Sequence, residues 1–265
     1  MRVDAVVVAG GVPSPGTPLF AEAGGRPKAL IDVAGKPMLQ WVLDALSDAT
    51  TIENVVLVGL GPDSGVTCAP PLHHVPDHGG LLDNLVAGIL ASRAINRAAS
   101  HTLVVSADIP TITGGMADWV VGAAEADEAE VCYTVVERAV MQQRFPSARR
   151  TWTRLRDVEF CSGSMHVLGA SLVDTDGRRR ARLLNARKSP LRQAAILGPR
   201  VALELLLGRV TLKQAAAGLS ARMAITGRAV VCPYAEVGMD VDAPEHLAIV
   251  REALAAMPAR RTLPS

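Results

Sequence analysis

A glycine-rich loop directly follows the first apolar run of the chain, and its residue types suit the binding of phosphate groups. The stretch VVVAGGVPSPGTPLFAEAGGRPKALIDVAGKPML, Val6 to Leu39, holds six glycines and two of the four lysines of the chain. A glycine loop at the C-terminal end of a strand in an open parallel sheet can point backbone N–H groups at phosphate oxygens. Gly10 and Gly11 stand where that is possible. The loop therefore predicts a phosphate-bearing ligand.

Two familiar phosphate-binding motifs do not explain this loop. Pro37 follows Gly35-Lys36, and Leu30 stands where a Walker A loop would have its first glycine. Glycines with a spacing close to a dinucleotide-binding motif occur at 59–65, but they follow the second predicted strand instead of the first. The loop must therefore belong to another class of phosphate-binding fold.

Strands and helices alternate in the part of the chain that must position this loop. Runs of buried β-branched residues predict strands, and apolar residues at helical spacing predict helices. The predicted strands are 3–9, 55–58, 73–75, 102–105, 130–136 and 228–232, and the predicted helices are 37–46, 81–94, 116–126 and a last one from Pro244. Such alternation implies parallel βαβ units. We expect an α/β fold, a three-layer α/β/α sandwich with a mostly parallel Rossmann-like sheet.

Three groups of residues together resemble a known family. The first group has the order strand, glycine loop, P-K pair, short strand and G-x-P before a helix, in Ala9-Gly10-Gly11, Pro27-Lys28, 29–33 and Gly35-Lys36-Pro37. The second is LVVSADIP, which ends a strand at Asp108. The third is DVDAPEHL, which contains Asp240, Asp242, Pro244 and Glu245. This pattern resembles the nucleotidyltransferases of the nucleotide-diphospho-sugar transferase (GT-A-like) superfamily, including MobA-like enzymes. The resemblance covers roughly 1–135 and 228–255.

The resemblance implies roles for the loop and for the acidic residues. Ala9, Gly10, Gly11 and Lys28 would bind the phosphates of an NTP, with Lys28 as a point charge and Arg26 in place of the loop arginine usual in the family. Asp108 and Asp242 would hold Mg²⁺, because hard oxygen ligands suit that ion, and Asp240 is a possible substitute. Lys28 and Asp108 would be the catalytic residues. For each aspartate alone, ending a strand or capping a helix is the simpler explanation.

Two further stretches are candidates for recognition of the base and of the acceptor. Gly79, Gly80 and Asn84 in DHGGLLDN would approach and read the base, although a loop and helix start without a ligand explains them equally well. Ser162, Gly163 and Ser164 in CSGSMH resemble an acceptor-side turn, and Arg187 and Lys188 would grip a phosphorylated or anionic acceptor. A solvated basic face is the commoner explanation of such a cluster.

Composition limits the possible partners and compartment. The chain has 265 residues, 49% of them apolar, and a net charge of +1, so no overall field favours nucleic acid. The widely spaced cysteines argue against a structural zinc site or a disulfide framework, and fit a reducing cytosol. With no signal peptide or apolar run of about 18 residues, we expect a cytoplasmic protein without a transmembrane segment.

The expected organisation is one nucleotidyltransferase domain at 1–257 and a tail at 258–265. Within it, an acceptor-side subregion spans about 138–227, with a helical insertion near 185–225. The leucine-rich segment 191–207 is expected to form a cap or a dimer surface, so a homodimer is possible; an apolar acceptor pocket is the alternative.

These features favour an Mg²⁺-dependent nucleotidyltransferase that transfers NMP from an NTP to a phosphorylated or anionic acceptor and releases pyrophosphate. One alternative is a GT-A-type glycosyltransferase that uses a nucleotide sugar, although no D-x-D pair stands at Ser106–Asp108. Another is a non-catalytic nucleotide-binding protein. Pyrophosphate release that depends on an acceptor separates the first hypothesis from both alternatives.

Overall fold

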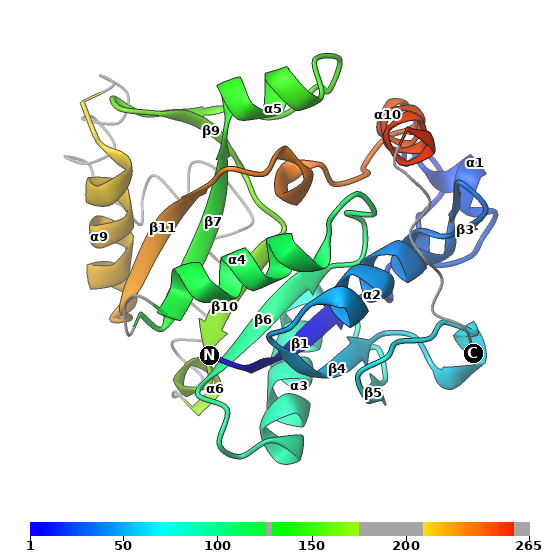
Figure 1. Cartoon of the computed structure of the whole chain (residues 1–265), viewed down its shortest axis with the longest axis horizontal. Coiled ribbons are helices and arrows are strands. Elements are labelled where there is room, and N and C mark those ends of the chain that lie inside the picture. Colours follow the sequence, from blue (N-terminus) through cyan, green and yellow to red (C-terminus); the bar gives the residue numbers. More distant parts are fainter. Residues whose placement is uncertain (126–128, 175–208, 257–265) are drawn as a thin grey trace.

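The computed structural model describes residues 1–125, 129–174 and 209–256 (Figure 1). Strand β1 (Val3–Val8) lies inside its sheet. Within these residues, nine strands form one sheet in the order β5-β4-β1-β6-β10-β7-β9-β8, with β11 also paired to β7. The other strands of this sheet are β4 (Ile52–Val58), β5 (Leu72–Val75), β6 (His101–Ser106), β7 (Val131–Glu137), β8 (Thr153–Arg154), β9 (Glu159–Ser162), β10 (Met165–Gly169) and β11 (Gly227–Cys232).

Parallel pairing around β1 brings the ends of distant strands together. β1 pairs with β4 on one side, through Val6 and Val56, and with β6 on the other, through Val6 and Val104. Both neighbours run parallel to β1, and the strand order reverses direction between β1 and β6. A crevice for a ligand forms at such a reversal, beyond the carboxyl ends of the strands.

One antiparallel strand interrupts the parallel sheet. β10 lies between β6 and β7 and is antiparallel to both, while β11 is parallel to β7. β9 continues along β7 beyond the turn at Gly163 and Ser164 and is antiparallel to it as well. The sheet is mixed but mostly parallel in its first half, so the expected α/β fold is confirmed.

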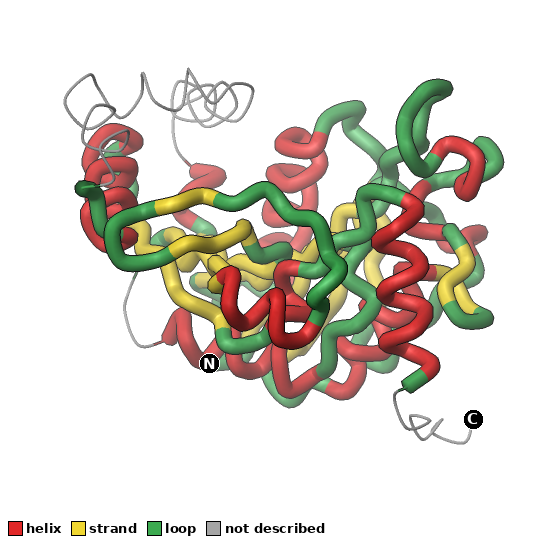
Figure 2. The backbone as a smooth tube through the Cα atoms, turned by 90° about the horizontal axis from the view of Figure 1, so that it is seen from above, coloured by secondary structure: helices red, strands yellow, loops and turns green. Residues whose placement is uncertain are grey.

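Helices cover the two faces of the sheet. α2 (Met38–Asp48) and α4 (Gly114–Glu125) pack against each other on one face, whereas α3 (Leu81–Ile95) lies on the other, against β1 and β4 (Figure 1). Figure 2 shows the helices on both sides of the strands from above. The remaining helices are α1 (Phe20–Ala23), α5 (Arg138–Arg144), α6 (Ser171–Asp174), α9 (Leu212–Met223) and α10 (Pro244–Ala255). This arrangement is the expected three-layer sandwich.

Two local elements differ from the sequence-based expectation. Residues 29–33 do not form one short strand: Lys28–Leu30 is a turn of 3₁₀ helix, and only Asp32–Val33 (β2) pairs, with Lys36–Pro37 (β3). The sequence pattern loosens after Glu137 and predicts no helix at 138–144, yet α5 begins there. α5 has seven residues and buries only Met141, so its sequence shows no helical period.

Part of the expected organisation falls outside the described residues. Most of the predicted insertion near 185–225, the segment 191–207 and the tail 258–265 lie there. The described end of the insertion is helical: α9 begins with a capping box between Thr211 and Gln214 and packs against β11. The expected single domain and the possible homodimer stay predictions.

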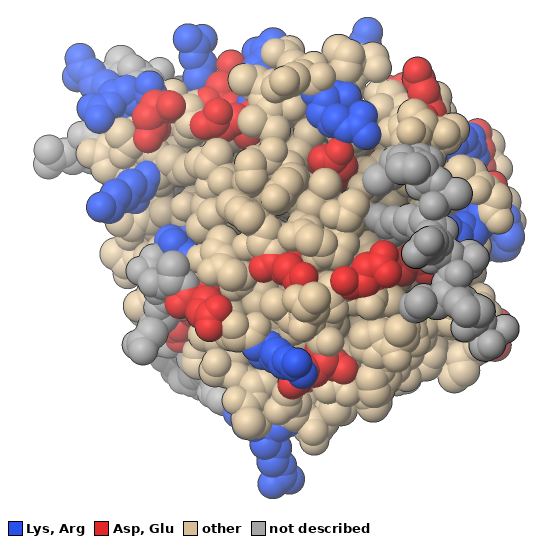
Figure 3. All heavy atoms as spheres, in the orientation of Figure 1, with Lys and Arg blue, Asp and Glu red and all other residues tan. Residues whose placement is uncertain are grey.

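The described surface carries charges of both signs. On the face drawn in Figure 3, lysine and arginine side chains are interspersed with aspartate and glutamate side chains. Within the described ranges, each helix is too short or too polar to cross a bilayer.

Candidate active site

A cavity of about 1110 Å³ lies at the carboxyl ends of β1 and β6. Because these parallel neighbours end at the same edge of the sheet, the residues that follow them meet there: Ala9, Gly10 and Gly11 after β1, and Ala107 and Asp108 after β6. The cavity extends from the loop after β5 to the turn between β9 and β10. This is the crevice expected where the strand order reverses.

A backbone hydrogen bond closes the long glycine loop and places Lys28 in the cavity. The amide N–H of Lys28 donates to the carbonyl oxygen of Gly11 at 2.9 Å. Ala29, the next residue, is 3% exposed and anchors the 3₁₀ turn in the core. The loop between Gly11 and Lys28 can therefore be long without moving the lysine away from the end of β1.

Lys28 brings together the two acidic motifs of the sequence. Its Nζ donates to Oδ2 of Asp108 at 2.6 Å and to Oδ1 of Asp242 at 2.7 Å. The backbone supports this convergence, because the N–H of Val241 donates to the carbonyl oxygen of Asp108 at 2.9 Å. The hydroxyl of Ser106 donates to the other carboxylate oxygen of Asp108 at 2.5 Å. Three side chains that are far apart in the sequence thus meet at one point.

The charges in this cluster stabilise one another. Burial would lower the pKa of Lys28, but the neighbouring carboxylates of Asp108 and Asp242 outweigh that effect and raise the pKa above its ordinary value. Burial would raise the pKa of Asp242, but the hydrogen bond and charge of Lys28, with the charge of Arg150, hold it below the ordinary value. The side chain of Asp242 is 61% exposed against 16% for Asp108, so solvent screens its ion pair more.

The donor set of this cluster fits a magnesium ion that is shared with a substrate. Two carboxylates already hold one cation, the ammonium of Lys28, at 2.6 and 2.7 Å. Mg²⁺ is commonly bound by one or two carboxylates together with substrate phosphates and water. Among the described residues there is no group of three or more His, Cys, Asp or Glu side chains suited to a metal. A metal held by these two carboxylates would take its remaining ligands from water or from the substrate.

A fixed loop forms one end of the cavity. Asn84 is 5% exposed, and its amide spans this loop: Nδ2 donates to Oδ1 of Asp77 at 2.7 Å, and Oδ1 accepts from the N–H of His78 at 2.6 Å. The N–H of Gly79 also donates to Asp77. The hydrogen bonds from Asn84 and Gly79 lower the pKa of Asp77. Gly79, Gly80 and Asn84 all line the cavity, and Asn84 in addition holds the loop; their role at the base stays a prediction.

The turn between β9 and β10 forms the other end of the cavity. Ser162, Gly163 and Ser164 line it, and the hydroxyl groups of Ser162 and Tyr133 lie 2.5 Å apart. A Cβ on Gly163 would lie 2.2 Å from Oγ1 of Thr134, so this position needs glycine. The rings of Tyr133 and His166 stack with centroids 4.3 Å apart. The predicted acceptor turn therefore faces the same cavity as the glycine loop.

The remaining predicted residues lie in different places. Asp240 lines the cavity, but its carboxylate pairs with Arg150, whose Nη1 also donates to the Asp240 carbonyl at 3.0 Å. Arg26 is exposed and does not line the cavity. Arg187 and Lys188 lie outside the described residues. The roles predicted for these four residues stay predictions.

Sequence reasoning missed several residues that line the cavity. Asp77 lies in the stretch DHGGLLDN, close to the predicted Gly79, and Ser106 lies in LVVSADIP, close to the predicted Asp108. Tyr133 and His166 lie on strands, where nothing in the alternation marks a ligand-facing position. Arg149, Arg150 and His246 are brought in by tertiary contacts. The set is Asp77, Ser106, Tyr133, Arg149, Arg150, His166 and His246.

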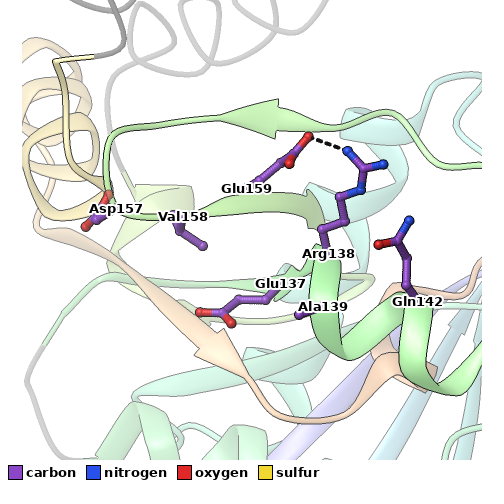
Figure 4. A pocket seen from close by; sticks show the side chains of 7 residues that line it. All are labelled: Glu137, Arg138, Ala139, Gln142, Asp157, Val158 and Glu159. Carbon is purple, nitrogen blue, oxygen red and sulfur yellow. Dashed lines mark hydrogen bonds and ion pairs between the residues drawn. The ribbon is translucent and has the colours of Figure 1, made fainter.

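A second, smaller hollow of about 460 Å³ lies between α5 and the loop before β9 (Figure 4). Its walls include the acidic side chains of Glu137, Asp157 and Glu159, and Arg138 pairs with Glu159 at 2.9 Å. None of the predicted site residues that the structure describes lines it. The larger cavity is therefore the candidate active site.

Comparison with known proteins identifies similar sequences and structures. Residues 5–194 match the model of the family described as MobA-like NTP transferase domain. A solved structure of a hypothetical transferase from Thermus thermophilus is 37% identical to this chain, covers 93% of it and 100% of itself, and superposes with a TM-score of 0.78. No curated protein sequence matches the chain.

More distant solved structures share the fold. A CMP:2-keto-3-deoxy-manno-octonic acid synthetase in complex with CTP is 17% identical, covers 96% of this chain and 99% of its own, and has a TM-score of 0.56. A 2-C-methyl-D-erythritol 4-phosphate cytidylyltransferase from Thermus thermophilus is 16% identical, covers 97% of this chain and 100% of its own, and has a TM-score of 0.52.

Proposed function

We propose a specific reaction for this chain from one premise: it belongs to the family of MobA-like NTP transferase domains and is a nucleotidyltransferase. The family resemblance expected from the glycine loop is thereby confirmed. The proposed reaction transfers NMP from an NTP to a phosphorylated or otherwise anionic acceptor, depends on Mg²⁺ and releases pyrophosphate.

One observation carries the proposal, namely the convergence of Lys28, Asp108 and Asp242 in the large cavity. A triphosphate needs cationic groups next to its β- and γ-phosphates. The phosphate that reacts also needs a metal ion that neutralises its charge. The cluster offers an ammonium and two carboxylates at one point. The cavity volume of about 1110 Å³ lies slightly above the usual range for small-molecule sites, which suits two substrates.

The proposed reaction makes and breaks one bond each. An acceptor oxygen forms a bond to the α-phosphorus, the bond from that phosphorus to the bridging oxygen breaks, and pyrophosphate leaves with the bonding electrons. Lys28 would neutralise phosphate charge, and backbone amides of Gly10 and Gly11 would orient the phosphates. Asp108 and Asp242 would hold Mg²⁺, which when bound supplies charge stabilisation to the reacting phosphate.

The two ends of the cavity suit the base and the acceptor. The loop of Asp77 and Gly79 supports the base subsite, and the turn at Ser162 supports the acceptor subsite. One fold neighbour is a complex with CTP and another is a cytidylyltransferase, so CTP is a candidate donor alongside the other nucleotides.

The test measures pyrophosphate release with each of the four NTPs, Mg²⁺, and a panel of sugar phosphates and carboxylic acids. We expect release that requires an acceptor, with one NMP-linked product formed per pyrophosphate. Lys28→Ala and Asp108→Ala should lose this activity while their circular dichroism spectra stay unchanged.

Three outcomes would contradict the proposal. Consumption of a nucleotide sugar without pyrophosphate would favour the glycosyltransferase alternative. NTP binding without turnover for any acceptor in the panel would favour a nucleotide sensor. Wild-type rates in either variant would refute the assigned site.

A further inference from the structure

Two segments that are far apart in the sequence are tied together at the wall of the candidate active site. Arg150 donates through Nη1 to the carbonyl oxygen of Asp240 at 3.0 Å and pairs with its carboxylate. Nε2 of His246, on α10, lies 3.2 Å from the carbonyl oxygen of Arg149. The segment of Arg149 and Arg150 is therefore fastened to the turn that carries Asp242.

His246 stands at the centre of this connection. Its side chain is 6% exposed, and both ring nitrogens have backbone partners. Nδ1 accepts from the N–H of Asp242 at 3.2 Å, because a backbone N–H can only donate. Nε2 must then carry the proton and donate to the carbonyl oxygen of Arg149, because a carbonyl can only accept. The two partners thus require the neutral Nε2–H tautomer.

The two partners of His246 belong to different halves of the cavity. Asp242 accepts the hydrogen bond from Lys28, next to Asp108, in the half assigned to the triphosphate. Arg149 lines the cavity with an exposed side chain and comes from the acceptor-side subregion. A single imidazole therefore bridges the backbone of a proposed metal ligand and the backbone of a cationic residue on the acceptor side.

We propose that His246 is a positioning residue that sets two things separately: through Nδ1 the place of the Asp242 carboxylate, and through Nε2 the place of the Arg149 guanidinium, which receives the acceptor's anionic group. This inference rests on the proposed function. It predicts that the two ring nitrogens have separable effects, because a small displacement of a positioning group weakens only the ligand that this group contacts.

Two conservative variants separate the two nitrogens. In His246→Asn the side-chain amide is attached at Cγ, where Nδ1 is attached in histidine, so an acceptor for the Asp242 N–H is kept and the donor to Arg149 is lost. In His246→Gln the amide lies one carbon further out, near the place of Nε2, so the donor to Arg149 is kept and the contact with Asp242 is lost. If the ring of His246 only filled space, the two substitutions would have similar effects on both ligands.

The readout is binding of probes that need no knowledge of the natural substrates. Mn²⁺ titrated in the presence of inorganic tripolyphosphate reports the half with Asp242. Inorganic phosphate, titrated into protein saturated with Mn²⁺ and tripolyphosphate, reports the acceptor half. His74→Gln is the control, because His74 also contacts a carbonyl, that of Leu60 at 2.9 Å, but does not line the cavity.

We expect His246→Asn to weaken phosphate binding by about threefold to tenfold, the range for one lost hydrogen bond, and to leave Mn²⁺ binding within about twofold of wild type. His246→Gln should show the reverse, and His74→Gln should change neither affinity. If both His246 variants alter both affinities to the same extent, or alter neither, the inference is overturned.

Two further results keep the test decisive. If neither variant folds, ¹⁵N NMR of the histidine rings in the wild-type protein still reports the tautomer of His246, and a ring protonated at Nδ1 instead of Nε2 overturns the inference. If wild-type protein binds no Mn²⁺ with tripolyphosphate, the proposed function itself fails. That result differs from a failure of His246 alone, in which wild-type binding is intact.

Discussion

The ammonium of Lys28 lies 2.6 Å from the Asp108 carboxylate, although 80 positions separate the two residues in the chain. The same ammonium bonds Asp242, so one cation contacts two carboxylates. A metal ion at these carboxylates would have to share them with Lys28. A triphosphate offers the ammonium other anionic partners, so metal and triphosphate should assist each other's binding.

Lys28→Met should therefore strengthen the binding of Mn²⁺ in the absence of nucleotide. Removal of the competing ammonium leaves both carboxylates for the metal, and we expect affinity to rise by about fivefold or more, the lower range of measured couplings between ligands. The measurement is a titration of Mn²⁺ followed by electron paramagnetic resonance. Lys36→Met is the matched control, because Lys36 pairs with Asp44 and does not line the cavity. Equal affinities in wild type and Lys28→Met would contradict the expected competition.

Gly10→Ala and Gly11→Ala should differ in stability although the two glycines are neighbours. A Cβ on Gly10 would lie 2.9 Å from Cα of Gly59, where the ends of β1 and β4 approach, whereas a Cβ on Gly11 would meet no atom of the described residues within 4 Å. Gly10→Ala should lower the free energy of unfolding by about 1 to 3 kcal/mol through overpacking. Urea unfolding measures both variants, and an equal loss in both would show that close approach is not the cause.

Asn84→Ala should weaken NTP binding by loosening the loop at the base end of the cavity. The substitution removes the hydrogen bonds to Asp77 and to the N–H of His78, and the pKa of Asp77 should rise toward its ordinary value. We expect the Kd for the NTP to rise by about tenfold, the upper range for one lost hydrogen bond. Asn54→Ala removes a comparable bond, to Asp4 at 2.8 Å, away from the cavity, and should leave the Kd unchanged. A Kd in Asn84→Ala equal to that of wild type would separate the loop from nucleotide binding.

Asp118→Asn should make the fold less stable, and the difference should depend on pH. Burial would raise the pKa of Asp118, but the hydrogen bonds from the backbone and hydroxyl groups of Thr50 and Thr51 outweigh burial and lower it. Because the folded-state pKa lies below the unfolded one, the stabilisation is present above about pH 4 and is lost as the pH falls through the folded-state value.

Urea unfolding of wild type and Asp118→Asn at pH 7, 5 and 3 measures this difference. We expect the free energy of unfolding of Asp118→Asn to be lower than that of wild type by about 1 to 2 kcal/mol at pH 7 and pH 5, because an amide accepts fewer and weaker hydrogen bonds than a carboxylate. This difference in the free energy of unfolding should become smaller at pH 3, because Asp118 of the unfolded chain is then largely protonated. A gap that stays constant or widens in acid would show that the charge of Asp118 contributes nothing.

Much of the fold could be read from the chain because its elements are locally encoded. Val3–Val8 and residues 55–58 of β4 are mostly β-branched and buried, so their composition alone marks strands, whereas the polar start of β4 was not predicted. The alternation of such runs with helices predicted the layers. The sequence did not predict α5, because its single buried residue, Met141, gives no helical spacing of apolar residues. The antiparallel place of β10 was equally hidden, because strand order is decided by contacts between strands and not within them.

For the candidate site, the sequence by itself determined which residue types are present: a glycine loop, a P-K pair and two acidic motifs, each in its own stretch of the chain. Only the tertiary structure decided that Lys28, Asp108 and Asp242 share one point, that Asn84 spans a loop, and that His246 joins Asp242 to Arg149. The physical reason is that a motif records local backbone and side-chain chemistry. Hydrogen bonds between residues many positions apart depend on where parallel strands end, which the whole sheet sets.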